Sequence, residues 1–267
     1  MEQDILMIDI PLYKVEYGEE KYGYTSLKGR ENLKKVLYRT SGNYCMYCYN
    51  RIKIDGNEYG HLEHAIEKAI SKDKLTECIP NIGIACPMCN DKYKKIGEKG
   101  RRPEEAAIQI FEKNVKCTKE NCKKPCQAYL ELKKSYLKRK SARFLMQPLG
   151  VTGKDIGCDG NRKLKMQYDI VEAKYLPSKK EEYSTKEKEF IEHHIDMFHL
   201  NTVERKSTQL IKFLKDVIQQ EGNYTRLEYN NQVVELFVKQ VLKDKTSEEI
   251  LKICKKLYTY AVLKFNT

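Results

Sequence analysis

The sequence predicts an α+β protein, in which a small unit clamped by two cysteine pairs precedes a mainly helical C-terminal region. Short β-branched segments lie between a Cys-x-x-Cys pair at residues 45–48 and a second pair at residues 86–89. The last third carries apolar residues at helical spacing and two capping boxes. We expect an N-terminal arm and helix (residues 1–40), the clamped unit (41–102), a basic helical and strand extension (103–180) and a helical module (181–267).

The charge of the chain predicts an anionic partner. Its 267 residues carry a formal net charge of +12, and neither a long apolar run nor an amphipathic anchor accompanies that charge. We therefore expect a nucleic acid, DNA first with RNA left open, and no membrane partner. Ten cysteines without a signal peptide predict a reducing compartment, where paired Cys-x-x-Cys motifs bind metal and do not form disulfides. The expected location is the cytoplasm.

The first forty residues predict an extended arm and a short helix. Residues 1–26 begin apolar and become rich in tyrosine, which is typical of extended chain. These tyrosines either grip a partner or pack against the domain, and packing is their ordinary role. They are Tyr13, Tyr17, Tyr22 and Tyr24. Within residues 27–39, Leu33, Val36 and Leu37 recur at the spacing of an amphipathic helix.

The two cysteine pairs predict a structural zinc site. Cys45 and Cys48 form one pair, Cys86 and Cys89 form the other, and two such pairs match a tetrahedral site with four thiolate ligands. Four sulfur ligands leave the zinc no open position for water or substrate. We therefore expect Zn²⁺ to hold the scaffold together while other residues carry the chemistry. The alternative is four unrelated buried cysteines, which does not account for the matched spacing.

The residues between the two cysteine pairs and just after them predict two strands and a helix. The strands are expected at residues 60–64 and 79–85, with a loop between them, and the helix at residues 90–96. This unit also contains five polar residues that could carry chemistry: an acidic residue, a histidine, two asparagines and a lysine. They are Glu63, His64, Asn81, Asn90 and Lys94. In this pattern the unit resembles the HNH nuclease family, and the resemblance implies a ββα-metal nuclease domain over residues 41–102.

These residue types suit metal-dependent phosphodiester hydrolysis. His64, with an unperturbed pKa near neutrality, is the candidate general base. Glu63 and Asn90 offer hard oxygen ligands to a catalytic Mg²⁺ or Mn²⁺. The resemblance implies that Asn81 holds the loop with the histidine, and Lys94 lies one helical turn beyond Asn90, within reach of a phosphate. Because neighbours on a regular strand point to opposite faces, Glu63 and His64 share a site only if the strand ends or twists there.

Two nearby positions leave alternatives open. Glu67 stands where members of the family often have a proline, which predicts a more mobile loop. His61 lies on the same strand face as Glu63 by the period of two. It is therefore either a further ligand of the catalytic ion or an ordinary packed or hydrogen-bonded side chain.

Basic residues that follow the second cysteine pair predict contacts with nucleic acid. One run lies beside the proposed site, and a second lies in residues 116–143, the most basic part of the chain. The alternative for both runs is a solvated charged surface. The predicted contacts are Lys92, Lys95, Lys99, Arg101, Arg102, Lys133, Lys134, Lys138 and Arg139.

Four further cysteines allow a second zinc site. Cys117, Cys122 and Cys126 lie close together in sequence, and Cys158 could complete the set. The alternative is free thiols ahead of a helix. The buried face of that helix is expected to consist of Tyr129, Leu132, Tyr136 and Leu137.

The end of the chain predicts a strand segment and then helices. Residues 163–175 have strand character. Ser184 with Glu187, and Thr246 with Glu249, form capping boxes, and Asn201 is expected to cap a helix between them. The histidines of this region lack partners at ligand spacing, so we expect packed or surface side chains at His193, His194 and His199. The helical module is expected to dock a partner or grip nucleic acid.

The layout of the whole chain suggests a setting for the clamped unit. That unit, a glycine-containing strand segment and the stretch HHIDMFHLN before a helix resemble the stand-alone HNH subunits of Septu (PtuB-like) and retron-associated antiphage systems. The resemblance implies a nuclease effector that works with an ATPase of the SMC/ABC-like class. No GxxxxGK[ST] motif occurs, so ATP hydrolysis would belong to another subunit.

Three functional hypotheses follow. The first is a Mg²⁺- or Mn²⁺-dependent endonuclease that cuts DNA, which gives a role to each of the five residues of the HNH-like pattern. The second is a catalytically silent, zinc-stabilised module that binds nucleic acid through its basic segments. The third is a restriction-type or homing-type HNH enzyme that acts alone.

Overall fold

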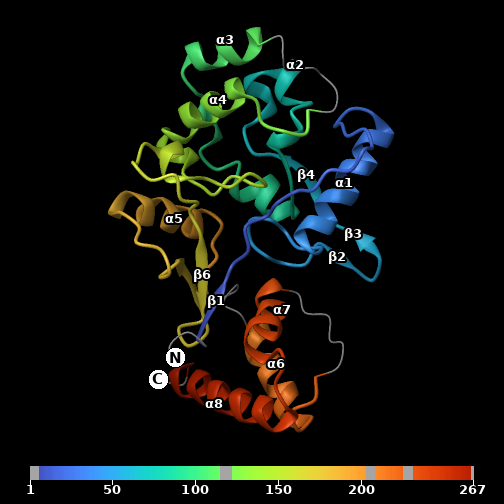
Figure 1. Cartoon of the computed structure of the whole chain (residues 1–267), viewed down its shortest axis with the longest axis vertical. Coiled ribbons are helices and arrows are strands. Elements are labelled where there is room, and N and C mark those ends of the chain that lie inside the picture. The colour runs from blue at the N-terminus through green and yellow to red at the C-terminus, as the bar shows by residue number, and fades with distance from the viewer. Residues whose placement is uncertain (1–5, 115–121, 203–207, 225–230, 266–267) are drawn as a thin grey trace.

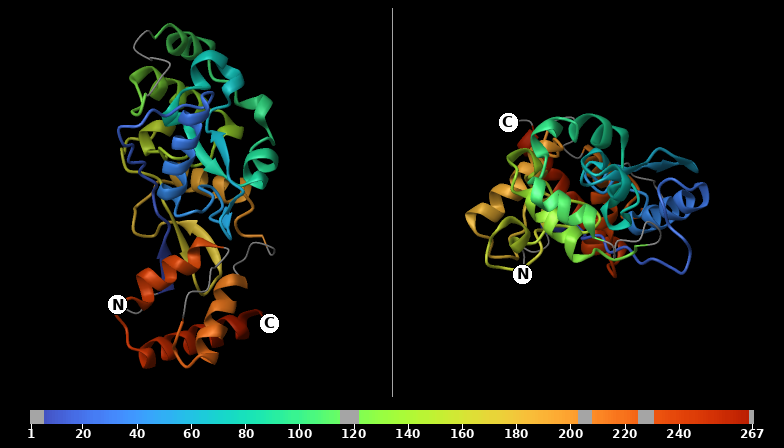
Figure 2. Two further views of the ribbon diagram at one scale, coloured as in Figure 1. Left: turned by 90° about the vertical axis from the view of Figure 1, so that its right-hand side faces the viewer. Right: turned by 90° about the horizontal axis from the view of Figure 1, so that it is seen from above.

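A computed structural model describes residues 6–114, 122–202, 208–224 and 231–265, and it confirms the α+β class. The molecule is elongated, with the helix at residues 105–113 near one end and the last three helices at the other (Figures 1 and 2). None of the described helices is long and apolar enough to cross a membrane.

Helices make up most of the regular structure. The α-helices are α1 Leu27–Ser41, α2 Lys72–Leu75, α3 Glu105–Lys113, α4 Gln127–Leu137, α5 Thr185–Met197, α6 Thr208–Gln219, α7 Gln232–Phe237 and α8 Ser247–Phe265. Short 3₁₀ segments are Lys68–Ile70, Ile79–Asn81, Glu98–Arg101, Lys140–Ala142 and Gly153–Ile156. The wider π-helical turns are Met88–Tyr93 and Val238–Leu242.

The described residues also form three small antiparallel sheets. The strands are β1 Met7–Asp9, β2 Lys53–Ile54, β3 Asn57–Glu58, β4 His61–His64, β5 Ile82–Ala85, β6 Met166–Asp169 and β7 Lys174–Pro177. In one sheet β6 lies between β1 and β7, so the N-terminal arm pairs with a strand from the middle of the chain. The other two are the pairs β2–β3 and β4–β5.

Two elements within the clamped unit differ from their predicted residue ranges. The second strand was expected over residues 79–85, but it begins at Ile82, because Pro80 lies in a 3₁₀ turn and has no N–H for a ladder. The following helix was expected over residues 90–96, but it is a π-turn over Met88–Tyr93. In β4–β5, Glu63 lies opposite Gly83 and His64 opposite Ile82.

Helices α1 and α4 bury the faces that their sequence spacing predicts. Leu33, Val36 and Leu37 are buried on α1, which packs against β5. On α4 the predicted stripe of Tyr129, Leu132, Tyr136 and Leu137 is buried as well. Burial of such large side chains stabilises each helix far more than its intrinsic propensity does.

The first helix of the C-terminal region packs with the clamped unit. The capping box of Ser184 and Glu187 opens α5 as predicted. Phe198, just after α5, stacks on Tyr47 between the first pair of cysteines, with ring centroids 4.7 Å apart. His194 is buried and its Nδ1 accepts a hydrogen bond from the Leu145 backbone N–H at 3.1 Å. Residues in and just after α5 thus take part in the packing around the cysteines.

Helices α6, α7 and α8 lie at the far end of the molecule, where α6 packs against both α7 and α8 (Figure 1). Thr246 and Glu249 make the predicted capping box before α8. Helix α7 contacts the clamped unit through Glu235, which accepts hydrogen bonds from the Tyr44 hydroxyl and the Arg51 guanidinium. Asn201 was expected to cap a helix, but its side-chain amide pairs with the backbone of Tyr175.

Candidate functional site

The four cysteines of the two Cys-x-x-Cys pairs meet at one point. Their sulfur atoms all lie within 4.8 Å of one another, and the Cys48 and Cys86 sulfurs are 3.7 Å apart. Four sulfurs bound at about 2.3 Å around a tetrahedral zinc lie about 3.8 Å apart, so the observed spacing fits that ion. Cys45, Cys48 and Cys89 are buried, and Cys86 is half-buried. The cluster can therefore hold a zinc ion that is closed to substrate.

The thiols of this cluster perturb one another strongly. Burial raises the pKa of Cys45 and of Cys89. Hydrogen bonds from the other three thiols lower the pKa of Cys86. Four adjacent thiols cannot all ionise in a buried site unless a cation compensates their charge, which is what a divalent metal ion with four thiolate ligands does.

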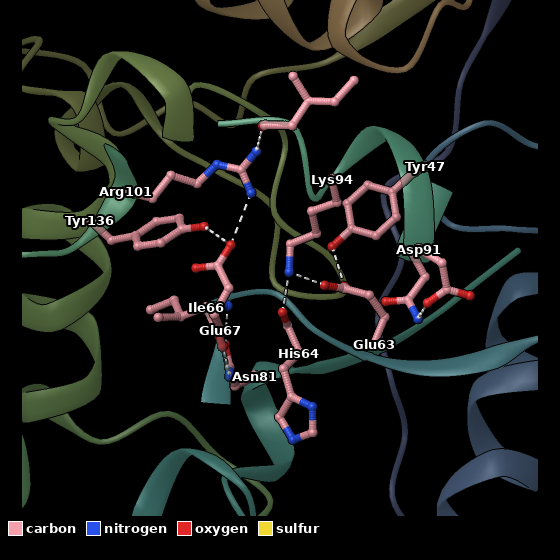
Figure 3. A network of polar contacts seen from close by, with 12 residues as sticks. Tyr47, Glu63, His64, Ile66, Glu67, Asn81, Asp91, Lys94, Arg101 and Tyr136 are labelled. Atoms are coloured by element: carbon pink, nitrogen blue, oxygen red, sulfur yellow. Dashed lines mark hydrogen bonds and ion pairs between the residues drawn. The ribbon is translucent and has the colours of Figure 1, made fainter. Parts of the chain in front are cut away.

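A cavity beside this cluster gathers four of the five predicted catalytic residues. Glu63, His64, Asn90 and Lys94 line a cavity of about 250 Å³. Tyr24, Glu67, Lys68, Asp91, Lys95 and Glu98 also line it. His64 is the last residue of β4, so the strand ends where the sequence argument required it to end. Both neighbours therefore reach one cavity, although the ring of His64 points away from the Glu63 carboxylate (Figure 3).

The Glu63 carboxylate is buried and already has a cationic partner. Lys94 donates hydrogen bonds from its ammonium to Glu63 Oε1 and to the backbone oxygen of His64 (Figure 3). The Tyr47 hydroxyl donates to Glu63 Oε2 at 2.6 Å. Lys94, expected to reach a phosphate, is itself buried in this arrangement. The Glu63 carboxylate and the His64 carbonyl thus form a place that holds a positive charge.

The hydrogen bond of the His64 ring fixes which nitrogen can act as a base. Nε2 lies 3.1 Å from the backbone oxygen of Thr76, and a carbonyl oxygen only accepts, so Nε2 carries the proton. Nδ1 then keeps its lone pair. Burial lowers the pKa of His64 to about 4. The ring is therefore neutral at physiological pH, and its Nδ1 carries no proton.

Asn81 holds the loop that follows His64. Its side-chain oxygen accepts from the Ile66 N–H at 2.8 Å, and its side-chain nitrogen donates to the Ile66 carbonyl at 2.8 Å (Figure 3). Its backbone oxygen accepts from the Ala65 N–H, and the Tyr129 hydroxyl donates to its side-chain oxygen. Asn81 is not one of the residues that line the cavity. Its contacts are those of a residue that positions the loop after His64.

Asn90 is half-buried in the cavity wall, beside the exposed Asp91 and His61. The Asn90 amide nitrogen donates to Asp91 Oδ1 at 2.9 Å, which leaves the amide oxygen of Asn90 available as a ligand. Asp91 Oδ2 lies 3.2 Å from His61 Nδ1. His61, which was expected to be either a metal ligand or an ordinary packed or hydrogen-bonded side chain, thus pairs with a carboxylate. Within the described ranges, the four cysteines are the only cluster of three or more His, Cys, Asp or Glu ligands.

Glu67 and Arg101 correct two expectations. Arg101, predicted to contact nucleic acid, is 0% exposed and forms an ion pair with Glu67 at 2.9 Å. Its other nitrogens donate to the backbone oxygens of Ser141 and Ile96. Glu67 also accepts from the Tyr136 hydroxyl, so an ion pair and a hydrogen bond hold the loop that was expected to be more mobile (Figure 3).

Replacement of Arg101 by alanine is expected to lower the free energy of unfolding by about 3 kcal/mol or more, because it leaves the Glu67 carboxylate buried without its cation. The adjacent Arg102 is a matched control, since it is 56% exposed and pairs with Glu105 on the surface. Its replacement is expected to change stability by less than about 0.5 kcal/mol. Urea unfolding of the two variants measures both changes, and equal destabilisation would contradict the structural role of Arg101.

The other side chains that were predicted to contact nucleic acid differ in their exposure to solvent. Lys133 is buried and pairs with Asp155 at 2.9 Å, so its predicted contact with nucleic acid is wrong for the same reason as that of Arg101. Arg139 is half-buried. The remaining side chains of the two runs are exposed, and Lys95 also lines the cavity. They are Lys92, Lys95, Lys99, Arg102, Lys134 and Lys138.

The second zinc site is not formed by the cysteines that the structure describes. Cys158 lies beside Ser184, with Sγ and Oγ 3.8 Å apart. The Cys126 sulfur accepts a hydrogen bond from the Asn114 side chain. The Cys122 sulfur donates to the backbone oxygen of Lys124. These three cysteines do not form one ligand cluster, and Cys117 lies outside the described residues.

Three residues of the site have no signal in the HNH-like pattern. Tyr47 supports Glu63, Asp91 joins Asn90 to His61, and Tyr24 lies against His64 with ring centroids 4.6 Å apart. Asp91 could have been found as an acidic residue next to a proposed ligand. Tyr24 comes from the N-terminal arm, far from His64 in sequence, and only the fold brings the two together.

Comparisons of the chain with protein-family models, with curated proteins and with solved structures found no match.

Proposed function

We propose that this protein is a metal-dependent endonuclease of the HNH type that hydrolyses phosphodiester bonds in DNA. One observation carries the proposal: Glu63, His64, Asn90 and Lys94 line one cavity beside the four-cysteine cluster. A module that only binds nucleic acid has no use for a neutral, buried histidine with one free lone pair next to a buried carboxylate. The supporting contacts of Asn81 and Tyr47 add to the same interpretation.

The donor set fits a hard divalent cation. Glu63 offers a carboxylate and Asn90 an amide oxygen, which are the ligand types that Mg²⁺ and Mn²⁺ prefer. The Lys94 ammonium forms an ion pair with the Glu63 carboxylate, so a positive charge is already stabilised at this position. When bound there, the ion would neutralise charge on the scissile phosphate and stabilise the leaving oxygen.

The chain's own residues then divide the work. His64 Nδ1 would take the proton of the attacking water, while the Nε2–H bond to Thr76 keeps the ring in the required tautomer. Asn81 fixes the loop behind His64 through its two hydrogen bonds to Ile66. Lys94 would hold a positive charge beside Glu63, in the cavity that the phosphate would enter.

The metal requirement of DNA cleavage tests the proposal. Asn90→Ala is expected to raise the Mg²⁺ or Mn²⁺ concentration for half-maximal cleavage by roughly tenfold or more, because it removes a ligand oxygen. Asn57→Ala is the matched control, since Asn57 is exposed on β3. Cleavage of plasmid DNA by zinc-loaded protein is followed over a metal titration. Cleavage without added divalent ion, or an unchanged requirement in Asn90→Ala, would contradict the proposal.

We also propose that the nuclease is the effector of a bacterial antiphage system with an ATPase of the SMC/ABC-like class. The layout resemblance supports this setting, and the sequence contains no phosphate-binding loop of its own. Sequence-specific cleavage by the chain alone would instead favour a stand-alone restriction or homing enzyme.

A further inference from the structure

Tyr24 brings the N-terminal arm to the wall of the proposed active site. Its ring contacts the His64 ring edge-on and lines the same cavity. The arm is fixed there because the backbone N–H groups of Tyr24 and Thr25 both donate to the Glu77 carboxylate at 2.8 Å. A Cβ on Gly29 would come within 2.8 Å of the Gly23 backbone nitrogen, so the arm and the start of α1 are tightly packed. The position of Tyr24 is therefore built into the fold.

Two cations lie against the Tyr24 ring. The Lys68 ammonium is 4.9 Å from the ring centroid and also contacts the Tyr24 hydroxyl at 3.4 Å. The Arg30 guanidinium carbon is 5.3 Å from the same centroid. Such cation–π contacts hold the two charges near the ring without neutralising them. Both side chains are exposed, and Lys68 lines the cavity.

Like Lys95 in the cavity wall, these two cations differ from Lys94 and Arg101, which each have a carboxylate partner. Lys94 is paired with Glu63, and Arg101 with Glu67. No carboxylate of a described residue pairs with Arg30 or Lys68. The first turn of α1, which contains Arg30, has no acidic residue either. An anionic ligand in the cavity would meet Lys68 next to His64, and Arg30 lies against the same Tyr24 ring.

We propose that Tyr24, Arg30 and Lys68 form a subsite for a backbone phosphate of the DNA strand, next to the phosphate that is cleaved. The inference rests on the proposed nuclease function for the identity of that strand. Arg30 and Lys68 contact the phosphate, and Tyr24 is the positioning residue that holds both cations beside His64. The subsite would set the path by which the strand leaves the cavity.

The salt dependence of DNA binding tests this subsite. Binding of a fluorescein-labelled DNA duplex to the full zinc-loaded chain is measured without added Mg²⁺ or Mn²⁺, so that no strand is cut. Each lost phosphate contact lowers the slope of log Kd against log salt concentration by about 1. The double variant Arg30→Gln, Lys68→Gln is therefore expected to lower the slope by about 2. A slope equal to that of the wild type would overturn the proposal.

A control removes the same charge elsewhere. Lys154 and Lys179 are exposed, and neither lines the cavity nor belongs to the predicted nucleic-acid contacts. Lys154→Gln, Lys179→Gln is expected to keep the wild-type slope, and an equal loss in this control would overturn the subsite by showing only an effect of net charge. Tyr24→Phe is expected to keep the slope and Tyr24→Ala to lower it, because only the first retains the ring.

The failure of the subsite and the failure of the nuclease function give different results. If the double variant lowers the slope but wild-type protein never cuts plasmid DNA in Mg²⁺ or Mn²⁺, the subsite stands and the nuclease function fails. If wild-type protein cuts the plasmid and the slope is unchanged in the double variant, the nuclease function stands and the subsite is overturned. Equal zinc content and equal circular dichroism of all variants show that each is folded.

Discussion

Replacement of Cys89 by serine is expected to abolish zinc binding and unfold the region around β4 and β5. Cys89 is buried, and its sulfur lies with those of Cys45, Cys48 and Cys86 in a cluster within 4.8 Å. Structural zinc sites contribute about 10 kcal/mol or more to folding, which exceeds the whole stability of many domains. Zinc content by mass spectrometry and thermal unfolding by circular dichroism measure the effect.

Cys158→Ser provides the control for that substitution. Cys158 is half-buried beside Ser184 and lies outside the four-cysteine cluster. The variant is expected to keep one zinc per chain and the melting temperature of the wild type. Retention of zinc and of the wild-type melting temperature in Cys89→Ser would contradict the structural role of the cluster.

Replacement of His64 by alanine is expected to lower the rate of DNA cleavage by about 10²–10⁴-fold, which is the contribution of a general base. The ring is neutral and its Nδ1 lone pair is free, because Nε2 donates to Thr76 and burial lowers the pKa to about 4. Single-turnover cleavage of a labelled duplex at saturating protein measures the chemical step. The fold is expected to survive, since the change removes one ring at the end of β4.

His61→Ala is the matched control for the loss of a histidine from β4. His61 is exposed and pairs with Asp91, and it does not line the cavity. Its loss is expected to change the single-turnover rate by less than about tenfold, because it removes no proton acceptor from the site. A rate loss in His61→Ala equal to that in His64→Ala would contradict the assignment of the base to His64.

Local signals in the sequence predicted much of the fold. The capping boxes at Ser184 and Thr246 lie where expected, because a cap is an interaction among residues three positions apart. The buried faces of α1 and α4 follow from helical spacing. The cysteine cluster follows from two pairs with matched spacing. In each case the residues that decide the structure are close together in the chain or share one ligand geometry.

The burial of basic residues could not be predicted in this way. Arg101 and Lys133 belong to basic runs whose other members are largely exposed. Their partners, Glu67 and Asp155, lie 34 and 22 residues away in the chain, so only the tertiary fold reveals the two ion pairs. Such a run predicts a charged surface as a whole but does not say which side chain turns inward.

The sequence predicted which residues belong to the candidate site, but it did not predict the contacts between them. The HNH-like pattern named four residues that line the cavity and a fifth, Asn81, that holds the histidine loop. It did not predict that Lys94 would be buried against Glu63, or that Tyr47 would support the same carboxylate. These contacts depend on how β4 and the π-turn at residues 88–93 pack together.

The most direct test of the nuclease proposal is a plasmid-cleavage assay with zinc-loaded wild type and His64→Ala, in Mg²⁺ and in Mn²⁺. Each protein is assayed alone and with an ATPase of the SMC/ABC-like class. We predict nicked and linear DNA from the wild type only when a divalent ion is added, and intact plasmid from His64→Ala at the same zinc content. If both proteins cut equally, His64 is not the base. If neither protein cuts under any of these conditions, the nuclease proposal is contradicted, and the chain is a zinc-stabilised protein that binds nucleic acid or a partner.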